Sequence, residues 1–130
     1  MSIDRRKQKK KASYAGIDRK VLDHEDYISL SGNAVKLLLE LARQYNGFNN
    51  GALSASWTLL KKRGFKSKTT LAKAKQELLA HRLIIETRTG RFLNPGGVCS
   101  LYALSWRPIN ECPDKNLEVL SSVKPPRTFA

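Results

Sequence analysis

Residues 61–91 have the sequence KKRGFKSKTTLAKAKQELLAHRLIIETRTGR, and this stretch decides the fold. Gly64 follows three basic residues and is typical of the position just after a helix, where a left-handed backbone is common. Ser67 is typical of an N-cap, because its side-chain oxygen can accept a hydrogen bond from the first turn of a helix. The stretch therefore predicts one helix that ends near Arg63 and a second that runs from Ser67 to about His81.

Apolar residues recur in both helices at the spacing of one helical face. In the second helix the expected buried stripe is Leu71, Ala74, Leu78 and Leu79, with Lys68, Thr69, Lys73 and Gln76 on the other side. The first helix, from about Ala55 to Arg63, would bury Trp57, Leu59 and Leu60. Two short helices joined around a glycine, the second polar and basic outward, are typical of a helix-turn-helix.

Upstream, the stretch VLDHEDYISLS (residues 21–31) predicts a short helix capped by Asp23 that ends near Leu30. Ser31 is then expected to cap the first long helix of the chain, which ends at the turn-forming NGFNNG of residues 46–51. Its apolar stripe is Ala34, Leu37, Leu38, Leu41, Ala42 and Tyr45. A brief extended piece, ALS, follows at residues 52–54.

Downstream, LIIETR (residues 83–88) is rich in β-branched residues and predicts a strand. The glycines and proline of residues 89–97 predict a hairpin tip. VCSLYALSW (residues 98–106) predicts the returning strand, with Tyr102, Leu104 and Trp106 on one face, and Pro108 ends it. The fold class expected is α+β, a winged helix made of a three-helix helix-turn-helix core plus a small antiparallel β-hairpin wing.

The same patterns divide the chain into three parts. Residues 1–13 have no apolar periodicity and too much like charge to fold alone, so they predict a basic disordered arm. Residues 14–108 form the winged-helix domain. Residues 109–130 lack any strong pattern and predict an irregular tail, of which KPPRTFA at residues 124–130 would be loose.

The formal net charge of +13 is concentrated in two places. Residues 1–13 contribute a net +5 and residues 61–91 a net +8, from ten basic and two acidic side chains. Clustered cations release condensed counterions when they meet phosphates, so nucleic acid is the partner that this segregation favours. An anionic membrane surface, RNA and an ordinary solvated helix face are the alternatives.

Other classes of protein find little support in the sequence. No apolar run approaches the roughly 20 residues of a membrane span, and a basic rather than apolar run follows Met1, so no secretory signal is expected. His24 and His81 are far apart and lie in no metal-ligand spacing, while Asp23, Glu25 and Asp26 suit a cap and solvated turn. We therefore predict no catalytic residues, no cofactor, no metal and no enzymatic activity.

Cys99 and Cys112 have no metal-like partners nearby in the sequence. In a cytoplasmic protein, which is the expected location, both would be free thiols. A disulfide between them is the alternative.

Several segments resemble a winged helix-turn-helix family of bacterial plasmids, prophages and other mobile elements. They are LSGNAVKLLLELARQYNGFNNGALSAS (30–56), SKTTLAKAKQELLAHRLI (67–84), YALSW (102–106) and, more weakly, INEC (109–112) and PPRTF (125–129). Replication-initiator domains are among the relatives of that family. The resemblance implies the winged-helix fold and DNA binding. Lys75 departs from the family pattern, because such helices usually place a leucine-like residue there.

In a winged helix the second helix of the motif lies in the major groove. The base-reading residues we expect are Thr69, Lys73 and Gln76. Phosphate contacts are expected from Lys61, Lys62, Arg63, Lys66, Ser67, Lys68 and Thr70, and from Arg88 and Arg91 of the hairpin at residues 88–97. The N-terminal arm would add Arg5, Arg6, Lys7, Lys9, Lys10 and Lys11.

The function predicted is that of a sequence-specific, double-stranded DNA-binding protein of a bacterial mobile element, acting in transcription regulation or replication. It would be cytoplasmic and nucleoid-associated, and a monomer or weak homodimer, since no long coiled coil is present. One alternative is a winged-helix protein-interaction module, such as a phage-encoded inhibitor that docks on a host protein or nucleoprotein complex. An RNA-binding adaptor is the other.

Overall fold

The computed structural model describes residues 12–90 and 97–129, and this part of the chain folds as α+β. Its helices are α2 (Arg19–Leu22), α3 (Glu25–Ile28), α4 (Gly32–Gln44), α5 (Trp57–Leu60) and α6 (Lys68–Ala80), with a 3₁₀ turn η1 (Lys61–Arg63) directly after α5. The strands are β1 (Leu53–Ser54), β2 (Ile84–Arg88) and β3 (Leu101–Leu104). From α4 onward this order confirms the succession of elements predicted from the sequence.

The two long helices form as predicted and supply much of the core. Ser31 caps α4 by accepting the Ala34 N–H at 3.3 Å, and the apolar stripe from Ala34 to Ala42 is buried. Ser67 caps α6 by accepting the Thr70 N–H at 3.1 Å. The buried residues of α6 are Leu71, Ala74 and Leu78, and Leu79 packs against the same core. Local periodicity thus sets the inner face of both helices.

The N-terminal helices differ from the prediction. A single helix capped by Asp23 was wrong, because Asp23 instead ends the short helix α2. His24 is the residue that caps α3, and its Nδ1 atom accepts the Asp26 N–H at 3.0 Å. Imidazole can accept a hydrogen bond as Asp does, so the capping position moves by one residue.

The turn between η1 and α6 is held by side chains of α4. Gly64 adopts the left-handed backbone expected of it, with φ of +94°. Its carbonyl accepts a hydrogen bond from Lys36 Nζ at 3.1 Å, and that ammonium group also lies 5.4 Å from the ring centroid of Phe65. Leu60 is buried, but Leu59 is 42% exposed, so its predicted burial was wrong.

Replacing Gly64 by alanine is expected to lower the free energy of unfolding by about 1–2 kcal/mol, since a Cβ disfavours the left-handed backbone. The added Cβ would also lie 2.3 Å from Lys36 Nζ, which must move away. Urea unfolding measures the effect. Gly32→Ala is the control, because a Cβ at this first residue of α4 meets nothing within 4 Å. Equal stability of the two variants would contradict this account of the turn.

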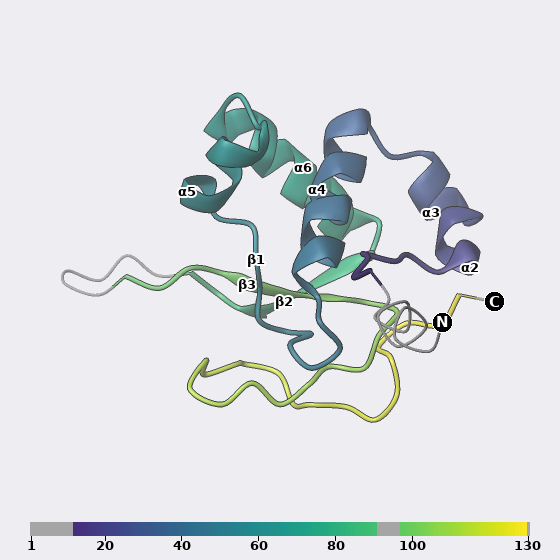
Figure 1. Ribbon diagram of the computed structural model, residues 1–130, viewed down its shortest axis with the longest axis vertical. Coiled ribbons are helices and arrows are strands. Elements are labelled where there is room, and N and C mark those ends of the chain that lie inside the picture. The colour runs from purple at the N-terminus through teal and green to yellow at the C-terminus, as the bar shows by residue number, and fades with distance from the viewer. Residues whose placement is uncertain (1–11, 91–96, 130) are drawn as a thin grey trace, which may run out of the picture.

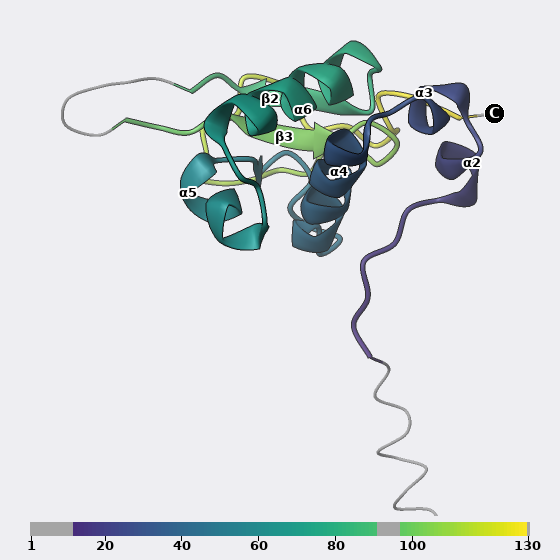
Figure 2. The ribbon, with the colours of Figure 1, turned by 90° about the horizontal axis from the view of Figure 1, so that it is seen from above.

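The sheet is antiparallel, with the order β1-β3-β2, so β3 lies in the centre. The helices cover one face of the sheet, and residues 109–129 run across the opposite face (Figure 1). Figure 2, seen from above, shows α4, α5 and α6 spread over the strands. Tyr102, Leu104 and Trp106, predicted to share one face, all belong to the hydrophobic core cluster. The intervening residues are buried as well, because both faces of the strand are covered.

The irregular C-terminal segment contains neither helix nor strand among residues 109–129, as expected. The prediction of a loose end was wrong, however. Phe129 is buried in the hydrophobic core, and its ring lies edge-on to Trp106 with the centroids 6.4 Å apart. Ile109 is buried as well. The segment is therefore a packed layer rather than a solvated tail.

Backbone groups on both outer edges of the sheet form hydrogen bonds within the chain. Gln44 pairs with the backbone of β1 as a strand would, since its Nε2 donates to Ser54 O at 2.7 Å and its Oε1 accepts from Ser54 N at 2.8 Å. On the other edge, the Glu118 N–H donates to Thr87 O of β2 at 2.7 Å. Unpaired strand edges invite pairing with other chains, so these contacts protect the sheet.

A buried asparagine joins the turn after α4 to the end of β3. Asn50 is fully buried, and its Nδ2 atom lies within 3.2 Å of the carbonyl oxygens of Leu104, Arg107 and Pro108. Its Oδ1 accepts the Leu104 N–H at 2.7 Å. Thus one side chain satisfies the polar backbone where the chain leaves the sheet.

Candidate nucleic-acid interface

The outward face of α6 is open to solvent. Thr69, Lys73 and Gln76 are all exposed, at helical spacing that places them on one face. The opposite face is the buried stripe that packs against α4 and the sheet (Figure 2). The fold therefore brings together the three residues that the sequence proposed for base reading.

Four exposed lysines surround the start of this helix. Lys61 and Lys62 belong to η1, Lys66 lies in the turn, and Lys68 begins α6. Within residues 12–90 and 97–129, none of the four ammonium groups pairs with a carboxylate. They lie at the helix end where the dipole is positive, so this part of the surface is strongly electropositive.

Arg63 differs from these four lysines because it pairs with a carboxylate. Its guanidinium forms a two-pronged pair with Glu40 of α4, at 2.8 Å from Nε to Oε1 and 3.2 Å from Nη2 to Oε2. The hydrogen-bonded carboxylate raises the pKa of Arg63 above its ordinary value. The pair ties η1 to α4, while the Arg63 side chain stays exposed, so its assignment as a phosphate contact remains a prediction.

Ser67 and Thr70 form hydrogen bonds with each other. The Ser67 hydroxyl donates to Thr70 Oγ1 at 2.9 Å while it accepts the Thr70 N–H. In this arrangement the Ser67 hydroxyl hydrogen is used within the chain, and its donation to a phosphate remains a prediction. The N–H groups of Lys68 and Thr69, also in the first turn of α6, lack intrahelical partners, as in any helix, and they keep the capacity for such a contact.

Arg88 is engaged at the base of the hairpin. Its Nε and Nη2 atoms donate to the Cys99 carbonyl at 3.0 and 2.7 Å, and Nη1 donates to the Lys115 carbonyl at 2.9 Å. Three of the five guanidinium N–H donors are used in these contacts, so the assignment of Arg88 as a phosphate contact stays a prediction. The base of the hairpin is instead tied to the C-terminal segment.

Some predicted site residues lie outside the described part of the chain. These are Arg91, most of the hairpin tip, and the arm residues Arg5, Arg6, Lys7, Lys9, Lys10 and Lys11. Their proposed contacts remain predictions from the sequence.

Lys75 is half-buried and faces the hairpin rather than the open face of α6. It lines a cavity of about 480 Å³ together with Ala55, Tyr102 and the residues at the hairpin base. Burial, as the largest cause, raises the pKa of Tyr102. Lys75 thus lies beside the exposed face of Thr69, Lys73 and Gln76 without belonging to it.

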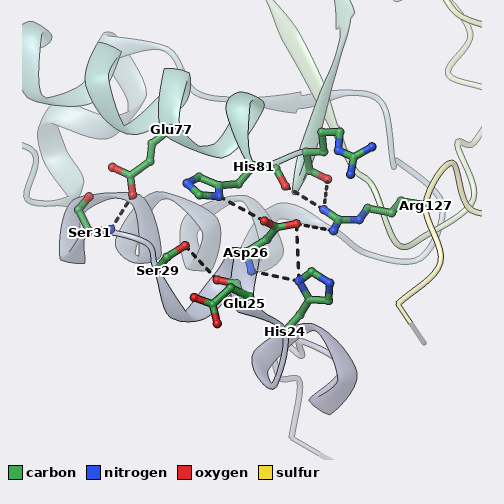
Figure 3. A network of polar contacts seen from close by, with 9 residues as sticks. His24, Glu25, Asp26, Ser29, Ser31, Glu77, His81 and Arg127 are labelled. Carbon is green, nitrogen blue, oxygen red and sulfur yellow. Dashed lines mark hydrogen bonds and ion pairs between the residues drawn. The ribbon is translucent and has the colours of Figure 1, made fainter.

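A polar network that sequence reasoning missed lies at the other end of α6 (Figure 3). Arg127 donates to His81 O at 2.8 Å and to Arg82 O at 3.2 Å, and it pairs with Asp26 of α3. The hydrogen bond from Arg127 lowers the pKa of Asp26 below its ordinary value. His81 Nδ1 lies 3.4 Å from the same carboxylate. The only sequence signal was the PPRTF motif, which contains Arg127.

Both cysteines are free thiols, which confirms that prediction. Burial raises the pKa of the Cys112 thiol. No three His, Cys, Asp or Glu side chains within residues 12–90 and 97–129 are grouped so that they could hold a metal ion. The helices of this same part of the chain are all too short or too polar to cross a membrane.

Comparison with family models, with curated proteins and with solved structures found no match to this chain.

Proposed function

We propose that this chain is a winged-helix protein that binds double-stranded DNA and recognises its sequence through α6. The observation that carries the proposal is the exposed face of Thr69, Lys73 and Gln76 beside four exposed lysines that pair with no carboxylate in the described part of the chain. The sheet order β1-β3-β2, with α5 and α6 between β1 and β2 in the chain, is compatible with that fold. A role in regulation or replication of a bacterial mobile element is part of this proposal; the family resemblance itself implies only the winged-helix fold and DNA binding.

The chemistry of the face suits base reading. Lysine can donate to guanine O6 and N7, glutamine can pair with adenine, and the threonine methyl can contact the thymine methyl. The major groove is about 12 Å wide and admits one helix. With α6 in the groove, Lys61, Lys62, Lys66 and Lys68 would face the phosphates on one side, and they would neutralise charge without reading sequence.

The proposal predicts different effects for two lysines of α6. Lys73→Ala should narrow the gap in affinity between a preferred site and random DNA by about 1–3 kcal/mol, because a base contact is lost. Lys68→Ala is the control: it should weaken binding to every sequence equally and leave that gap intact. Selection from a random duplex pool supplies the preferred site, and titrations with both DNAs measure the gap.

Selection that yields no motif would refute base reading by α6. If both variants bind DNA as the wild type does but lose capture of a protein partner, the face is a docking surface instead.

A further inference from the structure

We propose that residues 109–129 form a brace that holds the hairpin base and the C-terminal end of α6 in one arrangement. Arg88 and Arg127 are its positioning residues. The effect of the brace on DNA binding depends on the proposed function. The brace itself is inferred from contacts within the chain.

At the hairpin base, one guanidinium joins three segments. Arg88 of β2 donates to the carbonyl of Cys99, before β3, and to the carbonyl of Lys115 in the brace. Nearby, the Glu118 N–H donates to Thr87 O at 2.7 Å, and Glu118 Oε2 accepts the Thr89 N–H at 3.2 Å. The brace therefore fixes the point from which the hairpin leaves the sheet.

The middle of the brace is anchored beneath the sheet. Asn110 N donates to Asn50 O at 2.9 Å, and Ser122 N donates to Ile109 O at 2.9 Å, which closes the segment into a loop. Ile109 is buried as well. These contacts connect the hairpin end of the brace to its far end.

At the far end, Arg127 holds the backbone just past α6. Its guanidinium donates to the carbonyl of His81, the C-cap residue of α6, and to that of Arg82, which follows it. The backbone N–H of Arg127 also donates to Ser105 O at 2.9 Å, and Asp26 holds the guanidinium from the other side (Figure 3). Phe129, buried beside Trp106, secures the end of the segment.

A winged-helix protein engages DNA with its recognition helix and its hairpin together, so their relative placement affects affinity. Both arginines act through a planar fork of donors that reaches several carbonyls at once. Lysine keeps the charge but cannot reproduce that fork. Arginine-to-lysine substitutions therefore separate positioning from simple attraction to phosphates.

Hydrogen exchange tests whether the segment acts as a unit. Arg127→Lys should speed exchange by about tenfold not only near α6 but also at the Glu118 and Thr89 amides, at the opposite end of the brace. Lys124→Arg, at an exposed position in the same segment, is the control and should leave both ends unchanged. Faster exchange confined to residues around His81 and Arg127 would overturn the brace.

Titration with duplex DNA tests whether the brace affects DNA binding through Arg88. Arg88→Lys and Arg88→Ala should both weaken binding by about tenfold, with the salt dependence unchanged from the wild type. The opposite result has two parts: Arg88→Lys binds DNA as tightly as the wild type, and Arg88→Ala reduces the salt slope by about one unit. That result would show that Arg88 contacts a phosphate instead. Failure of the wild type to bind any duplex would refute the proposed function, and the exchange result alone would then decide the brace.

Discussion

Asn50→Ala is expected to lower the free energy of unfolding by about 3–5 kcal/mol, a large share of the stability of a small domain. The asparagine side chain bonds the backbone N–H and C=O of Leu104 and the carbonyls of Arg107 and Pro108. Alanine would leave these groups without that partner, and each buried orphan costs about 1–3 kcal/mol. Urea unfolding followed by the fluorescence of the buried Trp106 measures the loss.

Asn33→Ala is the matched control, because Asn33 is exposed on α4 and alanine favours a helix. It should leave stability unchanged or slightly raised. A loss below about 1 kcal/mol for Asn50→Ala would show that the end of β3 does not depend on this side chain.

Replacing Lys61, Lys62, Lys66 and Lys68 together by glutamine is expected to weaken binding to duplex DNA on the order of a thousandfold at about 0.1 M salt. Each phosphate contact contributes nearly one unit to the slope of log K against log salt, so four lost contacts remove most of the electrostatic term. The four side chains are exposed and make no ion pair among the described residues, so the fold should tolerate the change.

The control removes the same charge elsewhere. Arg19, Lys20, Arg43 and Lys124 are exposed on α2, on α4 and in the C-terminal segment, away from the start of α6. Their replacement by glutamine should cost far less affinity. Equal losses in the two variants would mean that net charge, rather than this surface, governs binding.

The helices that face the core could be predicted from local pattern. Ser31 and Ser67 cap the helices expected of them, and Gly64 adopts the left-handed backbone. These features depend on residues within a few positions of one another, so the sequence contains their cause directly. The exposed set of Thr69, Lys73 and Gln76 follows from the same periodicity.

The features that the sequence did not predict depend on contacts between distant positions. Asn50 bonds backbone groups 54 to 58 positions away, and Arg127 reaches Asp26 across 101 positions. The composition likewise gives no sign that Arg63 pairs with Glu40. Nor does it show that Arg88 donates hydrogen bonds to two backbone carbonyls. No periodicity marks the C-terminal segment, since irregular backbone packs through individual side chains.

The salt dependence of duplex binding by the whole protein tests the central claim most directly. A mobility-shift titration at three salt concentrations should give log K falling against log salt with a slope near −5, as about six neutralised phosphates require. No binding to any duplex at low salt, or an affinity independent of salt, would contradict the proposal that this basic face binds DNA.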